Sequence, residues 1–156
     1  MSIGIIKVEK GHKDSGHTLK GAKFQLTRVD DNDHPVSGAG EYQSDIQTVD
    51  PDTGKTSFSG LIPGGRYKLE EKEAPSGYVL VETPWYITVD MNGTAGLAAS
   101  YTMASNAGED NSFYIENEPG AALPNTGGPG TRLFMILGSI LILGAGVLLW
   151  RRRRLI

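Results

Sequence analysis

The sequence predicts an all-β domain, an antiparallel sandwich or open barrel, that is followed by a linker and one C-terminal transmembrane helix. Three observations support this fold class. Short segments alternate apolar and polar residues, as strands with one buried face do. Turn sequences separate these segments at short intervals. The longest apolar run of the chain lies close to its C-terminus, just before four consecutive arginines.

The strands are predicted where the alternation is clearest. Ala22, Phe24 and Leu26, for example, fall on one face of a strand. The predicted strands are Ile3–Glu9, Ala22–Arg28, Asp45–Val49, Thr56–Ser59, Arg66–Lys72, Trp85–Asp90, Ala98–Met103 and Ser112–Asn117. Between them, residues 52–54, 63–65, 74–77 and 91–93 combine Gly with Pro, Asn or Asp, which favours tight turns.

The composition excludes several classes of protein. The chain has 156 residues and a formal net charge of -3, which does not indicate nucleic-acid binding. It has no cysteine, so disulfides and thiolate metal sites are excluded. The first residues lack the basic and apolar regions of a signal peptide. We therefore expect the chain to be the C-terminal part of a longer protein or a truncated gene model.

The uncharged segment Leu133–Trp150 has the length of a transmembrane helix. Its 18 residues would span about 27 Å as a helix, close to the thickness of a bilayer core. The basic run Arg151–Arg154 follows, which predicts a cytoplasmic C-terminus and a domain outside the membrane. The alternative is a buried core helix, but a small β-domain does not need a helix that is apolar on all sides.

A five-residue motif precedes this segment after a Gly- and Pro-rich stretch. Together with the apolar run and the basic tail, it resembles the sorting signal of Gram-positive surface proteins; its residues are Leu123, Pro124, Asn125, Thr126 and Gly127. The resemblance implies that a sortase cleaves between Thr126 and Gly127 and joins the new carboxyl group to an amine. The domains are then the β-domain over residues 3–118, a linker over 119–132, the helix over 133–150 and the basic tail over 151–156.

Strand alternation singles out three polar residues on apolar faces. Lys7 follows Ile3 and Ile5, Glu71 follows Tyr67 and Leu69, and Asn117 follows Phe113 and Ile115. Burial favours the neutral amine, which is a nucleophile, and a protonated carboxyl group can polarise an amide and transfer protons. The three side chains could therefore form a Lys–Asn isopeptide bond with loss of ammonia. The alternative is that they lie at strand ends with their polar groups in solvent.

Four further stretches give a more specific indication of family: residues 6–9, 19–26, 58–64 and 67–78. They resemble the SpaA-like, collagen-adhesin B-type (Ig-like, prealbumin-like) domain of Gram-positive pilins and adhesins. The last of these stretches, residues 67–78, is similar to the pilin E-box. In that family a Lys of the first strand is bonded to an Asn of the last, and a Glu of the E-box assists. The resemblance places these roles on Lys7, Asn117 and Glu71. Lys10 is a second candidate for the lysine, and Glu70 and Glu73 are weaker candidates for the glutamate.

Metal and cofactor sites are not expected. The three histidines, His12, His17 and His34, lack ligand spacing. Residues 30–33 faintly resemble a calcium loop but lack the later Gly and Glu, so a solvated turn is the better interpretation.

The sequence predicts a structural cell-surface protein, the wall-proximal domain of a sortase-assembled pilin subunit. Its expected partners are a sortase and either peptidoglycan or another pilin subunit, and it contacts the membrane only before sorting. The alternative is the stalk of a wall-anchored adhesin whose upstream part binds host matrix. No Tyr-Pro-Lys pilin motif occurs in this chain. No enzymatic activity is expected beyond the single-turnover cross-link.

Overall fold

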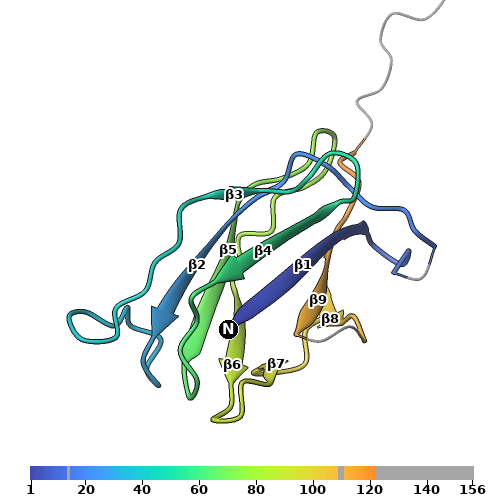
Figure 1. Cartoon of the computed structure of the whole chain (residues 1–156). Coiled ribbons are helices and arrows are strands. Elements are labelled where there is room, and N and C mark those ends of the chain that lie inside the picture. Colours follow the sequence, from blue (N-terminus) through green and yellow to red (C-terminus); the bar gives the residue numbers. More distant parts are fainter. Residues whose placement is uncertain (14, 109–110, 122–156) are drawn as a thin grey trace, which may run out of the picture. The chain divides into compact units, whose positions relative to one another are not determined.

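Nine strands arranged in two sheets make up the described part of the chain (Figure 1). The computed structural model describes residues 1–13, 15–108 and 111–121. Residues Met1–Gly120 form one compact unit. The strands are β1 (Ser2–Glu9), β2 (Lys23–Val29), β3 (Gln47–Thr48), β4 (Lys55–Ser59), β5 (Arg66–Glu73), β6 (Trp85–Val89), β7 (Ala95–Leu97), β8 (Ala104–Asn106) and β9 (Ser112–Asn117).

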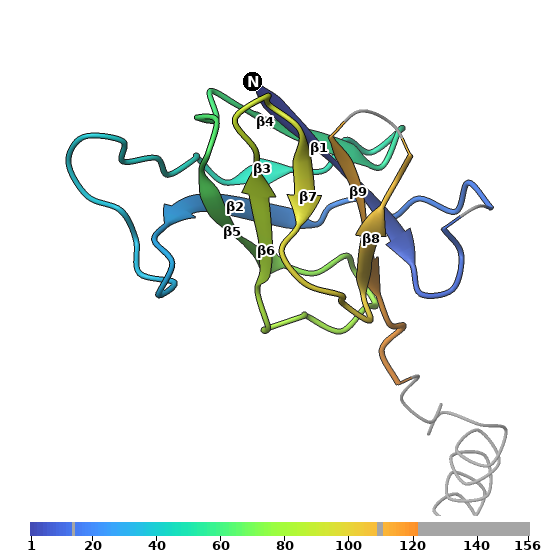
Figure 2. The same cartoon turned by 90° about the horizontal axis from the view of Figure 1, so that it is seen from below.

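Sheet A has the strand order β4-β1-β9-β8 and brings the first strand beside the last. β1 and β9 run parallel, with Lys7 opposite Ile115 and Glu9 opposite Asn117. Since the chain enters at the start of β1 and leaves after the end of β9, the N-terminus and the exit after Asn117 lie at opposite ends of the domain. Both views show this separation (Figures 1 and 2).

Sheet B has the order β3-β2-β5-β6-β7, and its pairs are antiparallel. Its central strand, β5, pairs with β2 over its whole length and with β6 over its first half. Alternate residues of β5 are buried, which directs Tyr67, Leu69 and Glu71 toward sheet A. The period of two in the sequence therefore predicts correctly which face of this strand is buried.

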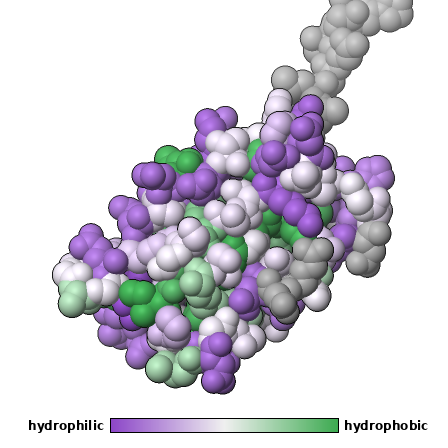
Figure 3. All heavy atoms as spheres, in the orientation of Figure 1, coloured by the Kyte–Doolittle hydropathy of each residue, from purple (hydrophilic) through white to green (hydrophobic). Residues whose placement is uncertain are grey.

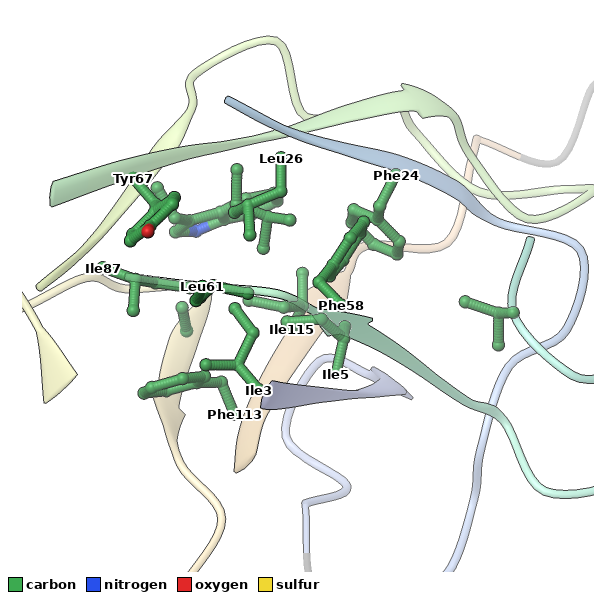
Figure 4. Packing of buried hydrophobic residues seen from close by; sticks show 14 of the residues in the cluster. Ile3, Ile5, Phe24, Leu26, Phe58, Leu61, Tyr67, Ile87, Phe113 and Ile115 are labelled. Atoms are coloured by element: carbon green, nitrogen blue, oxygen red, sulfur yellow. The ribbon is translucent and has the colours of Figure 1, made fainter. Parts of the chain in front are cut away.

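The core fills the space between the two sheets (Figure 4). Side chains from β1 and β9 meet side chains from β2, β5 and β6, and most of them are completely shielded from water. The labelled core residues are Ile3, Ile5, Phe24, Leu26, Phe58, Leu61, Tyr67, Ile87, Phe113 and Ile115. Burying this apolar surface is the main source of stability for a domain that has no disulfide.

The predicted strands agree with the structure except at β3 and between β6 and β9, where the short strands β7 and β8 were not predicted. Residues 98–103, predicted as one strand, instead connect β7 in sheet B to β8 in sheet A. Within this connecting segment, the Tyr101 hydroxyl accepts a hydrogen bond from the backbone N–H of Tyr86. A side chain therefore takes the place of a backbone acceptor from a neighbouring strand. Residues 45–49 also form only the two-residue strand β3. The two sheets confirm the predicted antiparallel sandwich, and among the described strands the pairing of β1 with β9 is the parallel one.

The face drawn in Figure 3 is mainly hydrophilic, with separate apolar patches. The exposed large apolar side chains among the described residues are Ile46, Ile62, Val79, Leu80 and Met91. Within residues 1–13, 15–108 and 111–121, no helix is long and apolar enough to cross a membrane. The predicted transmembrane helix over 133–150 and the basic tail over 151–156 lie outside the described residues, as does almost all of the predicted linker.

Candidate functional site

The three polar residues predicted from strand alternation all point into the interior. Lys7 comes from β1, Asn117 from β9 and Glu71 from β5. Lys7 and Asn117 are 0% exposed and Glu71 is 6% exposed. Two strands of sheet A and one strand of sheet B therefore bring together side chains that are more than 45 positions apart from one another in sequence. Burying three such groups is costly unless they interact.

The Glu71 carboxyl group lies between the Lys7 amine and the Asn117 amide. Its Oε1 atom lies 3.7 Å from Lys7 Nζ. Its Oε2 atom accepts hydrogen bonds from Asn117 Nδ2 at 3.0 Å and from the backbone N–H of Val81 at 2.9 Å. One carboxyl group therefore faces a nucleophile with one oxygen and an amide nitrogen with the other.

Backbone groups fix the outer parts of the site. Lys7 Nζ donates a hydrogen bond to the carbonyl oxygen of Ile115 at 2.9 Å. Asn117 Nδ2 also donates to the carbonyl oxygen of Val79 at 2.7 Å. Among the described residues, Asn117 Oδ1 and Glu71 Oε1 are buried without a hydrogen-bond partner. Unsatisfied buried oxygens of this kind are costly, and such groups in a native structure often have a chemical role.

The surroundings of Lys7 favour its neutral form. Burial lowers the pKa of the Lys7 amine from its ordinary 10.5 to about 8, because the charged form loses its hydration. The carboxyl groups of Glu71 and Glu116 oppose this shift without cancelling it. The Phe24 ring, whose centroid lies 5.9 Å from Lys7 Nζ, forms an apolar wall beside the amine. A substantial fraction of the amine is therefore nucleophilic near neutral pH.

The structure separates these residues from their alternatives. Lys10 is exposed and forms an ion pair with Glu118 at the surface. Glu70 lies on the outer face of β5 between two lysines, and Glu73 is exposed and pairs with Lys23. None of these three side chains reaches the interior, so the buried cluster consists of Lys7, Glu71 and Asn117.

Sequence reasoning missed two contributors to the site. The first is the segment after the E-box, whose backbone at Val79 and Val81 bonds both Asn117 and Glu71. No alternation marks this segment, because it contributes backbone groups rather than side chains. The second is Glu116, which is 3% exposed although it lies in β9 on the face opposite to Asn117. It pairs with Lys13 at 3.7 Å.

The two weak metal candidates show ordinary local interactions. Asp30 Oδ1 accepts hydrogen bonds from the backbone N–H groups of Asn32 and His34, which is the geometry of an Asx turn. The rings of His12 and His17 pack edge to face, 5.4 Å apart. Over the described ranges, no three His, Cys, Asp or Glu side chains come together as metal ligands.

Comparison with known protein families gives two matches. Residues 4–102 match the SpaA family, described as a prealbumin-like fold domain. Residues 115–154 match the LPXTG cell wall anchor motif, and this region includes the predicted sorting motif, which lies outside the described residues. A search of curated protein sequences gives no match.

Several solved structures share the fold. The pilus adhesin SpaC from Lactobacillus rhamnosus GG in its open conformation is 22% identical with a TM-score of 0.57, over 80% of this chain and 15% of that one. A C-terminal fragment of the same adhesin is 24% identical with a TM-score of 0.55, over 80% and 47%. The pilus adhesin RrgA from Streptococcus pneumoniae is 25% identical with a TM-score of 0.52, over 78% and 15%.

The present chain thus spans less than half the length of each of these proteins. The cell wall anchor motif identifies the protein as a cell-wall-anchored surface protein. The match over residues 4–102, together with the two-sheet fold, shows that the chain belongs to the SpaA family of prealbumin-like domains.

Proposed function

We propose that this chain is the wall-proximal domain of a sortase-assembled pilin subunit, stabilised by an isopeptide bond between Lys7 and Asn117. The observation that supports the cross-link best is the position of the Glu71 carboxyl group. Its two oxygens face Lys7 Nζ and Asn117 Nδ2, the atom that attacks and the atom that leaves. A single proton carrier can serve both in this arrangement.

The reaction is an exchange of one amide for another. The neutral Lys7 amine attacks the side-chain carbonyl carbon of Asn117, so a bond to Nζ forms and the bond to Nδ2 breaks. Glu71 gives a proton to Nδ2, which leaves as ammonia, and regains a proton from Nζ. No oxidation or reduction occurs. The reaction consumes its own side chains in one turnover, so the protein is not an enzyme in the ordinary sense.

The cross-link would carry tension past most of the domain. It joins β1 to β9, the two parallel strands at which the chain enters and leaves the fold. Force applied at the N-terminus would pass along β1 to Lys7, cross to Asn117 and leave through Glu118, without loading the core. The bond would also remove roughly 5 kcal/mol of unfolded-chain entropy, by analogy with a disulfide that closes a loop of similar length.

Anchoring follows from the sorting motif. Cleavage between Thr126 and Gly127 would join the Thr126 carboxyl group to peptidoglycan or to another pilin subunit. The membrane helix over 133–150 would then be needed only before cleavage. A domain fixed covalently at its C-terminal side must bear whatever force reaches its N-terminal side, which gives the cross-link a purpose.

The second candidate is the stalk of a wall-anchored adhesin whose ligand-binding region lies upstream. One observation favours it: the similar structures include two pilus adhesins, SpaC and RrgA. Sequencing the gene upstream of Met1 separates the two candidates, since a pilin motif there supports the shaft and a binding domain supports the adhesin.

Intact-mass measurement of residues 1–122 tests the cross-link. The expected mass is lower than the mass calculated from the sequence by one ammonia molecule. Lys7→Ala, Asn117→Ala and Glu71→Ala should each have the full mass calculated from their own sequence. Lys10→Ala is the matched control, because Lys10 is exposed, and its product should still lack one ammonia. A folded native domain with the full mass would contradict the proposal.

A further inference from the structure

An apolar groove lies beside the point where the chain leaves the domain. It has a volume of about 500 Å³ and lies between the segment after the E-box and the end of β9. Its lining residues are Val79, Leu80, Val81, Glu82, Met103 and Glu118. Val79 and Leu80 are 52% and 41% exposed, which is unusual for large apolar side chains in this domain. Apolar side chains that gather in a groove, rather than lying singly on the surface, are typical of a contact site for another molecule.

The groove is held at a fixed place relative to the end of the domain. Val79 donates its backbone N–H to the carbonyl oxygen of Glu118 at 3.0 Å, and Gly120 donates to the carbonyl oxygen of Gly77 at 2.7 Å. Tyr78 and Pro119 pair between these two bonds. The segment after the E-box therefore forms a short antiparallel ladder with residues 118–120, and Gly120 is the last residue that this ladder fixes.

The sorting motif begins three positions after this fixed point, at Leu123. Three residues of fully extended chain span at most roughly 11 Å. A sortase that encloses Leu123 to Thr126 in its cleft must therefore approach Gly120 to within about that distance. An enzyme domain is much larger than this gap, and Glu118, which lines the groove, is only two positions before Gly120, so the groove is within reach of the enzyme surface beside the cleft.

We propose that this groove is a docking surface for the sortase that cleaves Thr126–Gly127. The inference rests on the proposed sorting reaction and adds a second contact to it. The complementary surface would present an apolar side chain to Val79 and Leu80, with a basic side chain near the exposed carboxyl group of Glu82. Glu118 adds little charge, because Lys10 already pairs with it. The folded domain would thus help the enzyme to recognise its substrate.

The test follows the full chain in its own bacterium. Pulse-labelled membrane precursor is chased into the wall-linked form, with the sortase limiting. Leu80→Asp should slow this conversion roughly fivefold to tenfold, since it places a charge on the apolar contact. Ile46→Asp is the matched control, because Ile46 is 53% exposed and does not line the groove. Its rate should equal that of the native chain.

Two further variants keep the test decisive. Glu82→Lys reverses the charge at the rim without touching the core, so it should slow conversion even where Leu80→Asp impairs folding. Loss of one ammonia from the intact mass reports that each variant has formed its cross-linked core. A Gly-Ser insertion of about ten residues after Ala121 separates the motif from the groove. With this insertion, the chain that carries Leu80→Asp and the chain with the native Leu80 should be converted to the wall-linked form at nearly equal rates.

Other outcomes would overturn the inference in distinguishable ways. Equal conversion of the native, Leu80→Asp and Glu82→Lys chains would exclude docking while leaving the sorting reaction intact. If Leu80→Asp abolishes a dimer in sedimentation without slowing conversion, the groove is an interface between copies. Failure of the native chain to reach the wall would contradict the sorting reaction itself.

Discussion

Glu71 Oε1 lies 3.7 Å from Lys7 Nζ at a place where neither side chain is exposed to solvent. A buried ion pair contributes little net stability over apolar residues of the same volume, because both groups lose their hydration. Removing one member of the pair is more costly, because the other polar group then stays buried without its partner. A single substitution in the pair should therefore lower the stability of the domain, by an amount that depends on which residue is replaced.

Glu71→Ala should destabilise the domain more than Asn117→Ala does. Both variants lose the proposed cross-link, and with it roughly 5 kcal/mol of unfolded-chain constraint. Only Glu71→Ala also removes the acceptor of the buried Asn117 and Val81 hydrogen bonds and the partner of the Lys7 amine, which adds about 1–3 kcal/mol. Urea unfolding of the two variants measures the difference. Equal urea midpoints for the two variants would show that Glu71 does not offset the cost of burying the Lys7 amine.

Cross-link formation should accelerate as the pH rises toward 8. The pKa of the buried Lys7 amine is about 8, so each unit of pH below this value lowers the neutral fraction about tenfold. Chains recovered unfolded and not yet cross-linked, then refolded by dilution at each pH, give the rate from intact mass over time. A rate that does not change between pH 6 and pH 8 would contradict the assignment of Lys7 as the nucleophile.

A variant that keeps the free amine should become more stable in alkaline solution. In Asn117→Ala the folded pKa of Lys7, about 8, lies below its ordinary 10.5, so the unfolded state binds more protons between these values. The contribution of Lys7 to unfolding free energy thus rises by about 3 kcal/mol between pH 8 and pH 10.5. The double variant with Lys7→Met supplies the baseline, and the prediction fails if the two curves run parallel.

Gly54→Ala should weaken the start of β4 more than a comparable change elsewhere. Gly54 has a φ of 67°, its carbonyl oxygen accepts the backbone N–H of Lys7, and a Cβ atom would collide with the Thr18 side chain. Gly38→Ala is the matched control, because Gly38 has a φ of 75° but open space around it. Both lose about 1–2 kcal/mol to backbone strain. Thermal unfolding should show a larger loss for Gly54→Ala.

Phe24→Ala should destabilise the domain by about 3–5 kcal/mol, because Phe24 is fully buried and its loss leaves a cavity beside Lys7. Met91→Ala is the control, since Met91 is 79% exposed and surface changes usually stay within about 0.5 kcal/mol. Chemical unfolding of both variants checks the prediction. A loss below 1 kcal/mol for Phe24→Ala would show that the site does not depend on this wall.

Which side chains face inward could be predicted from the alternation of apolar and polar residues. Alternation along β1, β5 and β9 selected Lys7, Glu71 and Asn117, and the structure buries all three. The turn residues likewise placed most strand ends correctly, as at Gly77 and Gly93, whose φ angles are positive. These features are local, because a period of two and the conformational range of glycine act within a few residues.

Which residues contact one another could not be predicted in this way, because it depends on how the strands pair and how the sheets pack. The parallel pairing of β1 with β9 brings Lys7 rather than Lys10 to the buried site, and the segment at Val79 and Val81 closes that site with backbone hydrogen bonds. The connection between the two sheets at residues 98–103 likewise depends on long-range contacts. Alternation fixes the face of a strand but not its neighbour. Which strand becomes its neighbour depends on the long-range packing of whole strand faces, and this cannot be predicted from a short stretch of sequence.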